Sequence, residues 1–276
     1  MLAAFESVAP QADLERRFGG LARLYGAAGA ACIRRAHVAV AGIGGVGSWA
    51  AEALARSGVG ALTLIDLDHV AESNVNRQVH ALTCTLGQAK VEAMTERIAQ
   101  IHPGCRVRTI DDFVTADNWP ALLDGEPVDA VIDACDQMTA KVAMAAWALR
   151  TQAPFITIGA AGGKRYGQQA EIADLAETTH DPLLAELRRR LRHDHGAAKP
   201  EKSGHPRRIG ITAVFSREPV VRPDACDAAS PQTDGTLNCH GYGSTVAVTA
   251  TFGLIAAGWL LARIAQAPTQ TMSPNI

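Results

Sequence analysis

Cationic side chains follow an apolar run in the first third of the chain, where they could act on phosphates. Asp66 ends the run, Arg77 lies in the polar stretch that follows, and Lys90 opens a helical pattern. When a nucleoside triphosphate is cleaved, charge builds on the α-phosphoryl oxygens and on the departing pyrophosphate, and fixed cations stabilise it. A dehydrogenase needs no cations at these positions. The pattern therefore favours nucleotide cleavage over hydride transfer.

A glycine-rich segment predicts where the phosphates would bind. Gly42, Gly44 and Gly47 have the GxGxxG spacing, between a short β-prone run at 38–41 and helix-forming residues at 50–55. Glycines let the backbone approach a phosphate, and the free N–H groups at a helix start attract an anion. Dehydrogenases, methyltransferases and adenylating enzymes share this spacing, so it predicts a nucleotide site without specifying the nucleotide.

Alternating apolar and helical segments predict the elements that bring these residues together. Beyond the first strand, further strands are expected at 61–68, 105–111, 128–136 and 154–159, with a short helix at 117–123. This alternation is typical of an α/β fold with a mostly parallel, doubly wound sheet, in which ligands collect at the carboxyl ends of the strands. After residue 164 the alternation weakens, and we expect additional mixed strands and an apolar helix.

Carboxylates at two strand ends have separate expected roles. Asp66 lies 24 residues after Gly42, close to the spacing of an acid that holds ribose hydroxyls. Asp136 suits Mg²⁺, which takes one or two protein carboxylates together with phosphates and waters. Asp133, three residues earlier, is the alternative metal ligand, and we expect it instead to satisfy local backbone.

Composition excludes several classes of protein. The 276 residues are 47% apolar and 20% charged, which fits a soluble globular protein with one large domain or two smaller ones. The six cysteines include no CxxC pair, so we expect reduced thiols and no structural zinc. The first ten residues lack the basic and apolar stretches of a secretory signal, which predicts a cytoplasmic protein.

A basic segment at 186–208 could face a polyanion, although a solvated face is the plainer interpretation. We expect a helix over Pro182–His193 and a mobile loop over Gly196–Arg207. Against three acids the segment carries eight cations, which are Arg188, Arg189, Arg190, Arg192, Lys199, Lys202, Arg207 and Arg208.

The two ends of the chain predict helices that pack on the domain. Residues 13–33 read as a helical arm interrupted at Gly19-Gly20 and Gly26, and one of its arginines could reach a phosphate in a neighbouring subunit. The run 246–262 has seventeen residues without a charge, which is the lower limit for crossing a bilayer. We expect a buried or dimer-interface helix there, and no stable membrane span.

Taken in order, these motifs resemble the superfamily of ThiF, MoeB and the ubiquitin-activating enzymes, which adenylate a carboxylate with ATP and Mg²⁺. The resemblance rests on the glycine segment 42–48, Asp66-x-Asp68, Asn74-x-x-Arg77-Gln78, Lys90 and Asp136. It implies a Rossmann-like adenylating domain over 36–265, an arm over 1–35 and a disordered tail over 266–276.

The same resemblance implies roles for particular residues. Arg77, Lys90 and Asp136 would be catalytic, with Asp136 holding Mg²⁺ through ATP, and Arg17 or Arg23 of the arm would act in the partner subunit of a homodimer. The implied ATP-binding residues are Gly42, Gly44, Gly45, Gly47, Asp66, Asp68, Asn74, Arg77, Gln78 and Lys90.

Within the superfamily, residues 17–265 are most similar to the branch that dehydrates threonylcarbamoyladenosine in tRNA. The phrases that carry this likeness are 17–26, 44–56, 76–82, 111–115 and 248–253. The branch implies tRNA as substrate, the eight cations of 186–208 as its binding surface, and structural roles for Cys135 and Cys239. The alternative to a structural role is that one of these two thiols forms a thioester.

Two other functions remain open on the sequence. Activation of a small sulfur-carrier protein, or docking of a sulfur-transfer partner, would follow the MoeB and ThiF members. Their paired CxxC motifs are absent, and Gln137 replaces their usual Asn. An NAD-binding oxidoreductase or sensor is the third possibility, and Arg77 and Lys90 argue against it.

Overall fold

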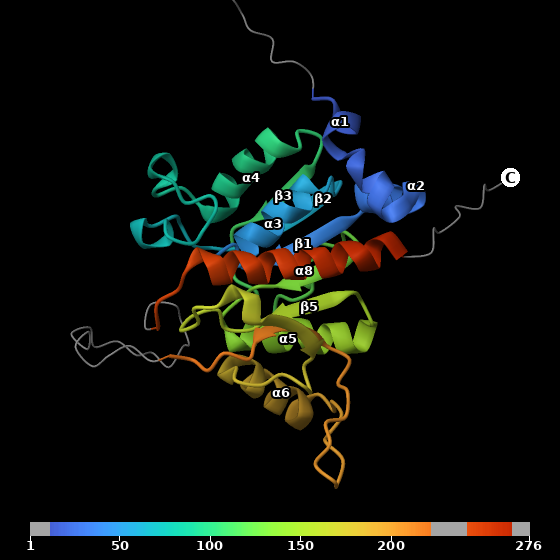
Figure 1. The fold of residues 1–276 in the computed structure, drawn as a ribbon, viewed down its shortest axis with the longest axis vertical. Helices are drawn as coiled ribbons and strands as arrows, with labels where there is room; N and C mark the ends of the chain where they lie inside the picture. Colours follow the sequence, from blue (N-terminus) through green and yellow to red (C-terminus); the bar gives the residue numbers. More distant parts are fainter. Residues whose placement is uncertain (1–11, 222–241, 267–276) are drawn as a thin grey trace, which may run out of the picture.

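The computed structural model describes residues 12–221 and 242–266 (Figure 1). Cys226 and Cys239 lie outside the described residues. So does the expected tail apart from Gln266, the last residue of the C-terminal helix.

A seven-stranded sheet organises the fold, in the order β3-β2-β1-β4-β5-β7-β6. All neighbouring strands are parallel except β6 and β7, which confirms the predicted doubly wound sheet with mixed strands added late in the chain. The strands are β1 (His37–Ala41), β2 (Ala61–Ile65), β3 (Arg106–Ile110), β4 (Ala130–Asp133), β5 (Phe155–Ile158), β6 (Ala170–Asp174) and β7 (Thr212–Ser216). Every residue of β1 and β2 is buried, as expected for central parallel strands covered on both faces.

Helices cover both faces of the sheet and form two cores. Ile33, Leu54, Met94 and Phe252 represent the core on one face, which comes from α2, α3, α4 and α8. The core on the other face comes from α5 and α6. The helices are α1 (Leu14–Phe18), α2 (Gly20–Arg35), α3 (Gly47–Arg56), α4 (Lys90–Ile101), α5 (Met138–Thr151), α6 (Pro182–Asp194) and α8 (Val246–Gln266), with 3₁₀ turns at Glu72–Asn74, Thr83–Thr85, Ala121–Leu123 and Gly167–Gln169.

The apolar helix α8 is a core helix of this fold. Its length and composition would also allow it to cross a membrane, but half of its most apolar window is buried inside the protein. It crosses the sheet beside α3 and α2 (Figure 1). A Cβ at Gly253 would lie 2.4 Å from the carbonyl oxygen of Val46, so glycine is needed for α8 to approach the glycine segment.

Three predicted elements differ in extent. The fourth strand ends at Asp133 rather than at residue 136, because the Asp133 side chain accepts from the backbone N–H of Cys135 and turns the chain. The helix expected at 117–123 is only the 3₁₀ turn Ala121–Leu123, since Pro120 has no N–H to continue a helix. The N-terminal arm kinks at Gly26, where φ is 74°, as its glycines predict.

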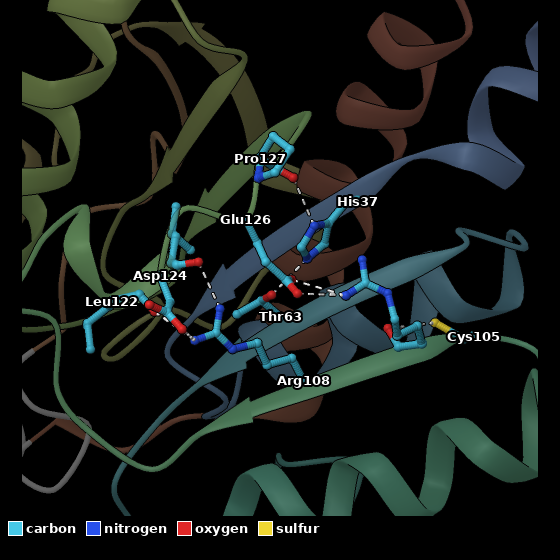
Figure 2. A network of polar contacts seen from close by, with 10 residues as sticks. His37, Thr63, Cys105, Arg108, Leu122, Asp124, Glu126 and Pro127 are labelled. Atoms are coloured by element: carbon cyan, nitrogen blue, oxygen red, sulfur yellow. Dashed lines mark hydrogen bonds and ion pairs between the residues drawn. The ribbon is translucent and has the colours of Figure 1, made fainter.

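A buried histidine ties the start of β1 to the loop before β4 (Figure 2). One ring nitrogen of His37 lies 3.0 Å from the carbonyl oxygen of Pro127, and the other lies 2.8 Å from the Thr63 hydroxyl. Burial lowers the pKa of His37. This network lies at the amino ends of the strands, so it supports the sheet at the edge opposite the predicted site.

His80 is the buried histidine with the strongest consequence for stability. It is 1% exposed, and neither ring nitrogen has a hydrogen-bond partner among the described residues. Burial, reinforced by Lys90 and Arg97, lowers its pKa to about 4. The folded protein therefore holds His80 neutral at a pH where the unfolded chain, with a His pKa of about 6.5, already binds a proton.

We expect the free energy of unfolding to fall as pH drops from about 6.5 to about 4, with His80 alone contributing on the order of 3 kcal/mol. Urea titrations at several pH values measure this slope. His80→Leu should flatten it and cost little at pH 7.5, because the imidazole makes no hydrogen bond. A variant whose pH dependence matched that of the natural chain would contradict this assignment.

Candidate active site

A cavity of about 630 Å³ lies over the carboxyl ends of β2, β1, β4 and β5. The glycine turn, the polar loop after β2, the start of α4, and the loops after β4 and β5 all line it. A second hollow of about 700 Å³ between α1 and α4 contains, among the predicted site residues, only Arg17. The predicted chemistry therefore belongs to the cavity over the strand ends.

The glycine turn adopts the conformation that its sequence predicts. Gly42 has φ of 85°, and a Cβ there would lie 2.8 Å from the carbonyl of Ala134. A Cβ at Gly47 would lie 1.8 Å from the Gly42 oxygen, so this position also requires glycine. A Cβ at Gly44 would meet no atom within 4 Å, which leaves this part of the turn open to a ligand.

Asp66 connects the glycine turn to the cations of the cavity. One carboxylate oxygen accepts from the Ile43 N–H at 2.6 Å, and the other accepts from the Asp68 N–H at 2.9 Å. Burial raises the pKa of Asp66, while Lys90 and the two N–H groups oppose that shift. The carboxylate therefore holds the turn in addition to its implied role on the ribose.

Lys90 is a buried cation aimed at these carboxylates. Its Nζ lies 2.6 Å from Asp68 Oδ2 and 3.7 Å from Asp66 Oδ1, and its side chain is 8% exposed. Asp68 is more than half exposed. A buried ammonium between one buried and one exposed carboxylate can exchange the exposed partner for a phosphate without moving far.

Arg77 lies against the glycine turn. A Cβ at Gly45 would come within 3.3 Å of Arg77 Cγ, so glycine makes room for this side chain. Its guanidinium donates to the carbonyl oxygen of Ser73 at 2.6 Å and to Asn76 Oδ1 at 2.9 Å. The Arg77 carbonyl accepts from the Trp49 indole at 2.9 Å, which anchors the backbone independently of the side-chain charge.

The polar loop also presents a buried acceptor to the cavity. Gln78 is 5% exposed and lines the cavity, and within the described part of the chain its Oε1 has no hydrogen-bond partner. Asn74 is buried as well, but its Oδ1 accepts from the Ala71 N–H at 3.0 Å, so it shapes the loop. A buried acceptor costs free energy unless a donor reaches it, so Gln78 fits a ligand that brings an N–H or O–H group.

The loop after β4 carries the expected metal ligand. Asp136 is exposed and lines the cavity, whereas Asp133 is fully buried. Asp133 pairs with Lys141 at 3.0 Å and accepts from the Thr157 hydroxyl at 2.6 Å, so it acts beneath the cavity. Burial, followed by the Asp133 charge, raises the pKa of Cys135 well above its usual value, which disfavours a thiolate nucleophile.

The arm arginines differ in what they contact. Arg17 donates to the carbonyl oxygens of Gln100 and Ile101, the latter at 2.6 Å, and so caps the end of α4. Arg23 is exposed and makes no hydrogen bond or ion pair with the described part of the chain. Between the two, Arg23 is therefore the arginine whose charge is not used within the described part of the chain.

The basic segment is partly used within the fold. Arg188 donates to the carbonyl oxygen of Leu175 at 2.9 Å, Arg189 and Arg190 both pair with Glu186, and Arg192 donates to Ala198. The remaining four cations of 186–208 are exposed, and Arg208 lies 3.8 Å from Asp174.

Several residues of the site lack a clear sequence signal. Thr249 of α8 and Phe113 after β3 line the cavity, and both come from segments that are distant in the sequence. Lys141 is fully buried under the site. The sequence signal that could have identified Lys141 is a single lysine in an otherwise apolar helix that follows a strand ending in an aspartate.

A glycine turn, two cations and a strand-end carboxylate around one cavity define a nucleotide-binding, adenylating class of protein. Residues 18–276 match the ThiF family, and the chain belongs to that family.

The particular relatives narrow this assignment. The chain is 45% identical to the tRNA threonylcarbamoyladenosine dehydratase of Escherichia coli K12 over 255 residues, covering 90% of this chain and 93% of the relative. The dehydratase of Bacillus subtilis is 40% identical, with 72% and 74% covered. A crystal structure of the E. coli dehydratase TcdA in complex with ATP superimposes with a TM-score of 0.79 at 44% identity, covering 92% of this chain and 96% of that one.

A relative with another activity matches less of the chain. The molybdopterin-synthase adenylyltransferase of Salmonella typhimurium is 33% identical over 129 residues, or 47% of this chain and 51% of the relative.

Proposed function

We propose that this protein uses ATP to dehydrate threonylcarbamoyladenosine in tRNA to its cyclic form. The observation that carries the proposal is the placement of Arg77 and Lys90 in the same cavity as an open glycine turn. Identity to named dehydratases along nearly their whole length supports the substrate. The ATP complex of the E. coli relative supports the nucleotide.

The first step would be adenylation of the substrate. The free carboxylate of the threonylcarbamoyl group attacks the α-phosphorus of ATP, a P–O bond forms, and pyrophosphate leaves with its bonding electrons. Arg77 and Lys90 stabilise the charge that develops on the α-phosphoryl and pyrophosphate oxygens. The product is an acyl-adenylate, in which AMP is a good leaving group.

Ring closure would then take place within the substrate. A nitrogen of the carbamoyl group, or its oxygen, attacks the activated carbonyl carbon and loses a proton, and AMP departs with the former carboxylate oxygen. The net change is the loss of one water from the nucleoside. The oxygen atom that the nucleoside loses, a former carboxylate oxygen, ends in AMP. A tethered nucleophile has a high effective concentration, so no catalytic cysteine is required.

Mg²⁺ fits Asp136 together with ATP. Among the described residues no group of three or more His, Cys, Asp or Glu side chains could hold a metal unaided. Mg²⁺ commonly binds through one or two carboxylates plus substrate phosphates, and an exposed Asp136 at the cavity wall meets that need. When bound, the ion would neutralise charge on the phosphates.

A homodimer would complete the site with Arg23. This guanidinium is exposed on α2, next to Leu24, which is 72% exposed in the described structure. A large exposed apolar side chain beside a cation that makes no contact within the described part of the chain suits contact with a second subunit. Because the substrate is tRNA, we place the protein in the cytoplasm.

The anticodon stem-loop would lie on the basic segment. We expect Lys199→Ala/Lys202→Ala/Arg207→Ala to weaken tRNA binding and to reduce the slope of log K against log salt by about 2, because each of these exposed cations neutralises one phosphate. Filter binding at several salt concentrations measures the slope.

The matched control removes three exposed arginines elsewhere, at Arg34, Arg35 and Arg150. If this control lowered the salt slope as much as the first variant did, binding would reflect general charge, and the assigned surface would be wrong.

Activation of a small sulfur-carrier protein is the second candidate, because a molybdopterin-synthase adenylyltransferase matches half of the chain. ATP–pyrophosphate exchange separates the two functions. Exchange that requires tRNA carrying threonylcarbamoyladenosine supports the dehydratase. Exchange that requires a carrier protein ending in Gly-Gly, and is indifferent to tRNA, would replace it with the second candidate.

A further inference from the structure

Asp181 links the cavity to the basic helix α6. It is the N-cap of that helix, and its Oδ1 accepts from the Leu184 N–H at 3.0 Å. Its Oδ2 accepts from the Ala160 N–H at 2.9 Å, and Ala160 belongs to the loop after β5 that lines the cavity. One buried carboxylate therefore bonds to the cavity loop and to the helix at the same time.

Two neighbours strengthen this link. A Cβ at Gly159 would lie 2.1 Å from Asp181 Oδ2, so glycine allows the loop to approach the carboxylate. Lys164, at the other end of the loop, is 3% exposed and donates to the carbonyl oxygens of His180 at 3.3 Å and Glu218 at 2.8 Å. The loop is thus held to the start of α6 at two points.

The order of the strands indicates what this loop would contact. Asp66 directly follows β2 and the glycine turn follows β1, so the nucleoside and phosphates would occupy that half of the cavity. The loop after β4 carries Asp136, and the loop after β5 lies one strand further away. The carboxylate that attacks the α-phosphorus must approach in line with the departing pyrophosphate and from the opposite side, and the part of the cavity that the nucleotide would leave free for it is lined by Gly159–Gly162.

We propose that Asp181 is a positioning residue that makes one rigid unit of the acyl-binding loop and α6, the helix that leads into the exposed cations of the basic segment. This rests on the proposed function, because the basic segment must carry tRNA for the coupling to matter. Docking of the tRNA on the basic segment then places its acyl group against the loop at residues 159–162. Misplacement of a reacting group by about 1 Å can cost roughly 100-fold in rate, so a single buried contact is sufficient.

Two substitutions separate this link from the helix cap. Asp181→Asn and Asp181→Ser both retain an oxygen that caps α6, since Asn, Asp and Ser are similarly good N-caps. Neither can also accept from Ala160, because the amide has one oxygen and the hydroxyl is too short. In the full-length protein we expect kcat for tRNA conversion to fall tenfold to 100-fold, with KM for ATP and the melting temperature nearly unchanged.

Asp13→Asn is the matched control. Asp13 caps α1 by accepting from the Arg16 N–H at 3.0 Å, and its other carboxylate oxygen bonds to no described residue. It should leave kcat unchanged. An unchanged kcat in both Asp181 variants would overturn the inference, and so would a loss of kcat that only follows a fall in melting temperature or in ATP affinity.

Hydrogen exchange tests the link without any assay of turnover. The peptide covering 159–164 should exchange faster in Asp181→Asn than in the natural protein, while the peptide covering the glycine turn should not change. Equal protection at 159–164 would overturn the link itself. If the natural protein fails to convert tRNA, the proposed function is wrong, and the exchange result still decides whether Asp181 holds the loop.

Discussion

Arg77→Ala should lower the rate of adenylation roughly 10³-fold while the protein remains folded. The guanidinium lies beside the glycine turn, where we propose that it stabilises charge on the phosphates, and Arg77 is the only arginine or lysine of the polar loop between β2 and α4. Its backbone carbonyl keeps the bond from Trp49, which still anchors the loop when the side chain is removed. ATP–pyrophosphate exchange in the presence of modified tRNA measures the effect.

Arg106→Ala is the control for this substitution. Arg106 begins β3 at the opposite edge of the sheet, where it is 60% exposed and pairs with Glu126 at 3.1 Å. Its removal should leave exchange unchanged. Full exchange by the Arg77 variant would mean that the phosphates bind elsewhere.

Lys90→Met should abolish activity and also destabilise the protein. The substitution removes the only cation within 4.0 Å of Asp66 among the described residues and leaves that buried carboxylate unpaired. Loss of one partner of a buried ion pair typically costs about 3–5 kcal/mol. Denaturant titration at pH 7 measures the stability, and the exchange assay measures the activity.

The pH dependence of this variant has a defined sign. Burial already raises the pKa of Asp66 and Lys90 opposes that shift, so Lys90→Met raises the pKa further. A carboxyl with a raised folded-state pKa destabilises the fold above that pKa, and protonation removes the cost. The stability deficit relative to the natural protein should therefore shrink as pH falls through the raised pKa of Asp66 in the variant. Lys90→Arg keeps the charge, so its stability deficit should be small. A deficit of Lys90→Met that did not change with pH would contradict the pairing of Lys90 with Asp66.

Much of the fold could be predicted because its signals are local. Buried parallel strands read as continuous apolar runs, and the spacing of Gly42, Gly44 and Gly47 reflects steric limits within a few residues. The strand-end position of Asp66 is set by the same local pattern. These features identify the edge of the sheet where the cavity lies.

The rest depends on contacts between distant segments. Lys141 pairs with Asp133 only because α5 packs beneath β4, and no periodicity in the sequence reports that pairing. Asp181 meets Ala160 through the order of β5, β7 and β6. A run of arginines in the sequence likewise does not reveal that Arg188 donates hydrogen bonds to backbone carbonyl oxygens instead of facing solvent.

The most direct test follows both products of one reaction. The protein is incubated with ATP labelled at the α-phosphate and tRNA carrying threonylcarbamoyladenosine, and the nucleosides are then analysed by mass spectrometry. We expect labelled AMP in an amount equal to that of a nucleoside that has lost one water. Formation of ADP, or of AMP while the nucleoside keeps its mass, would contradict it.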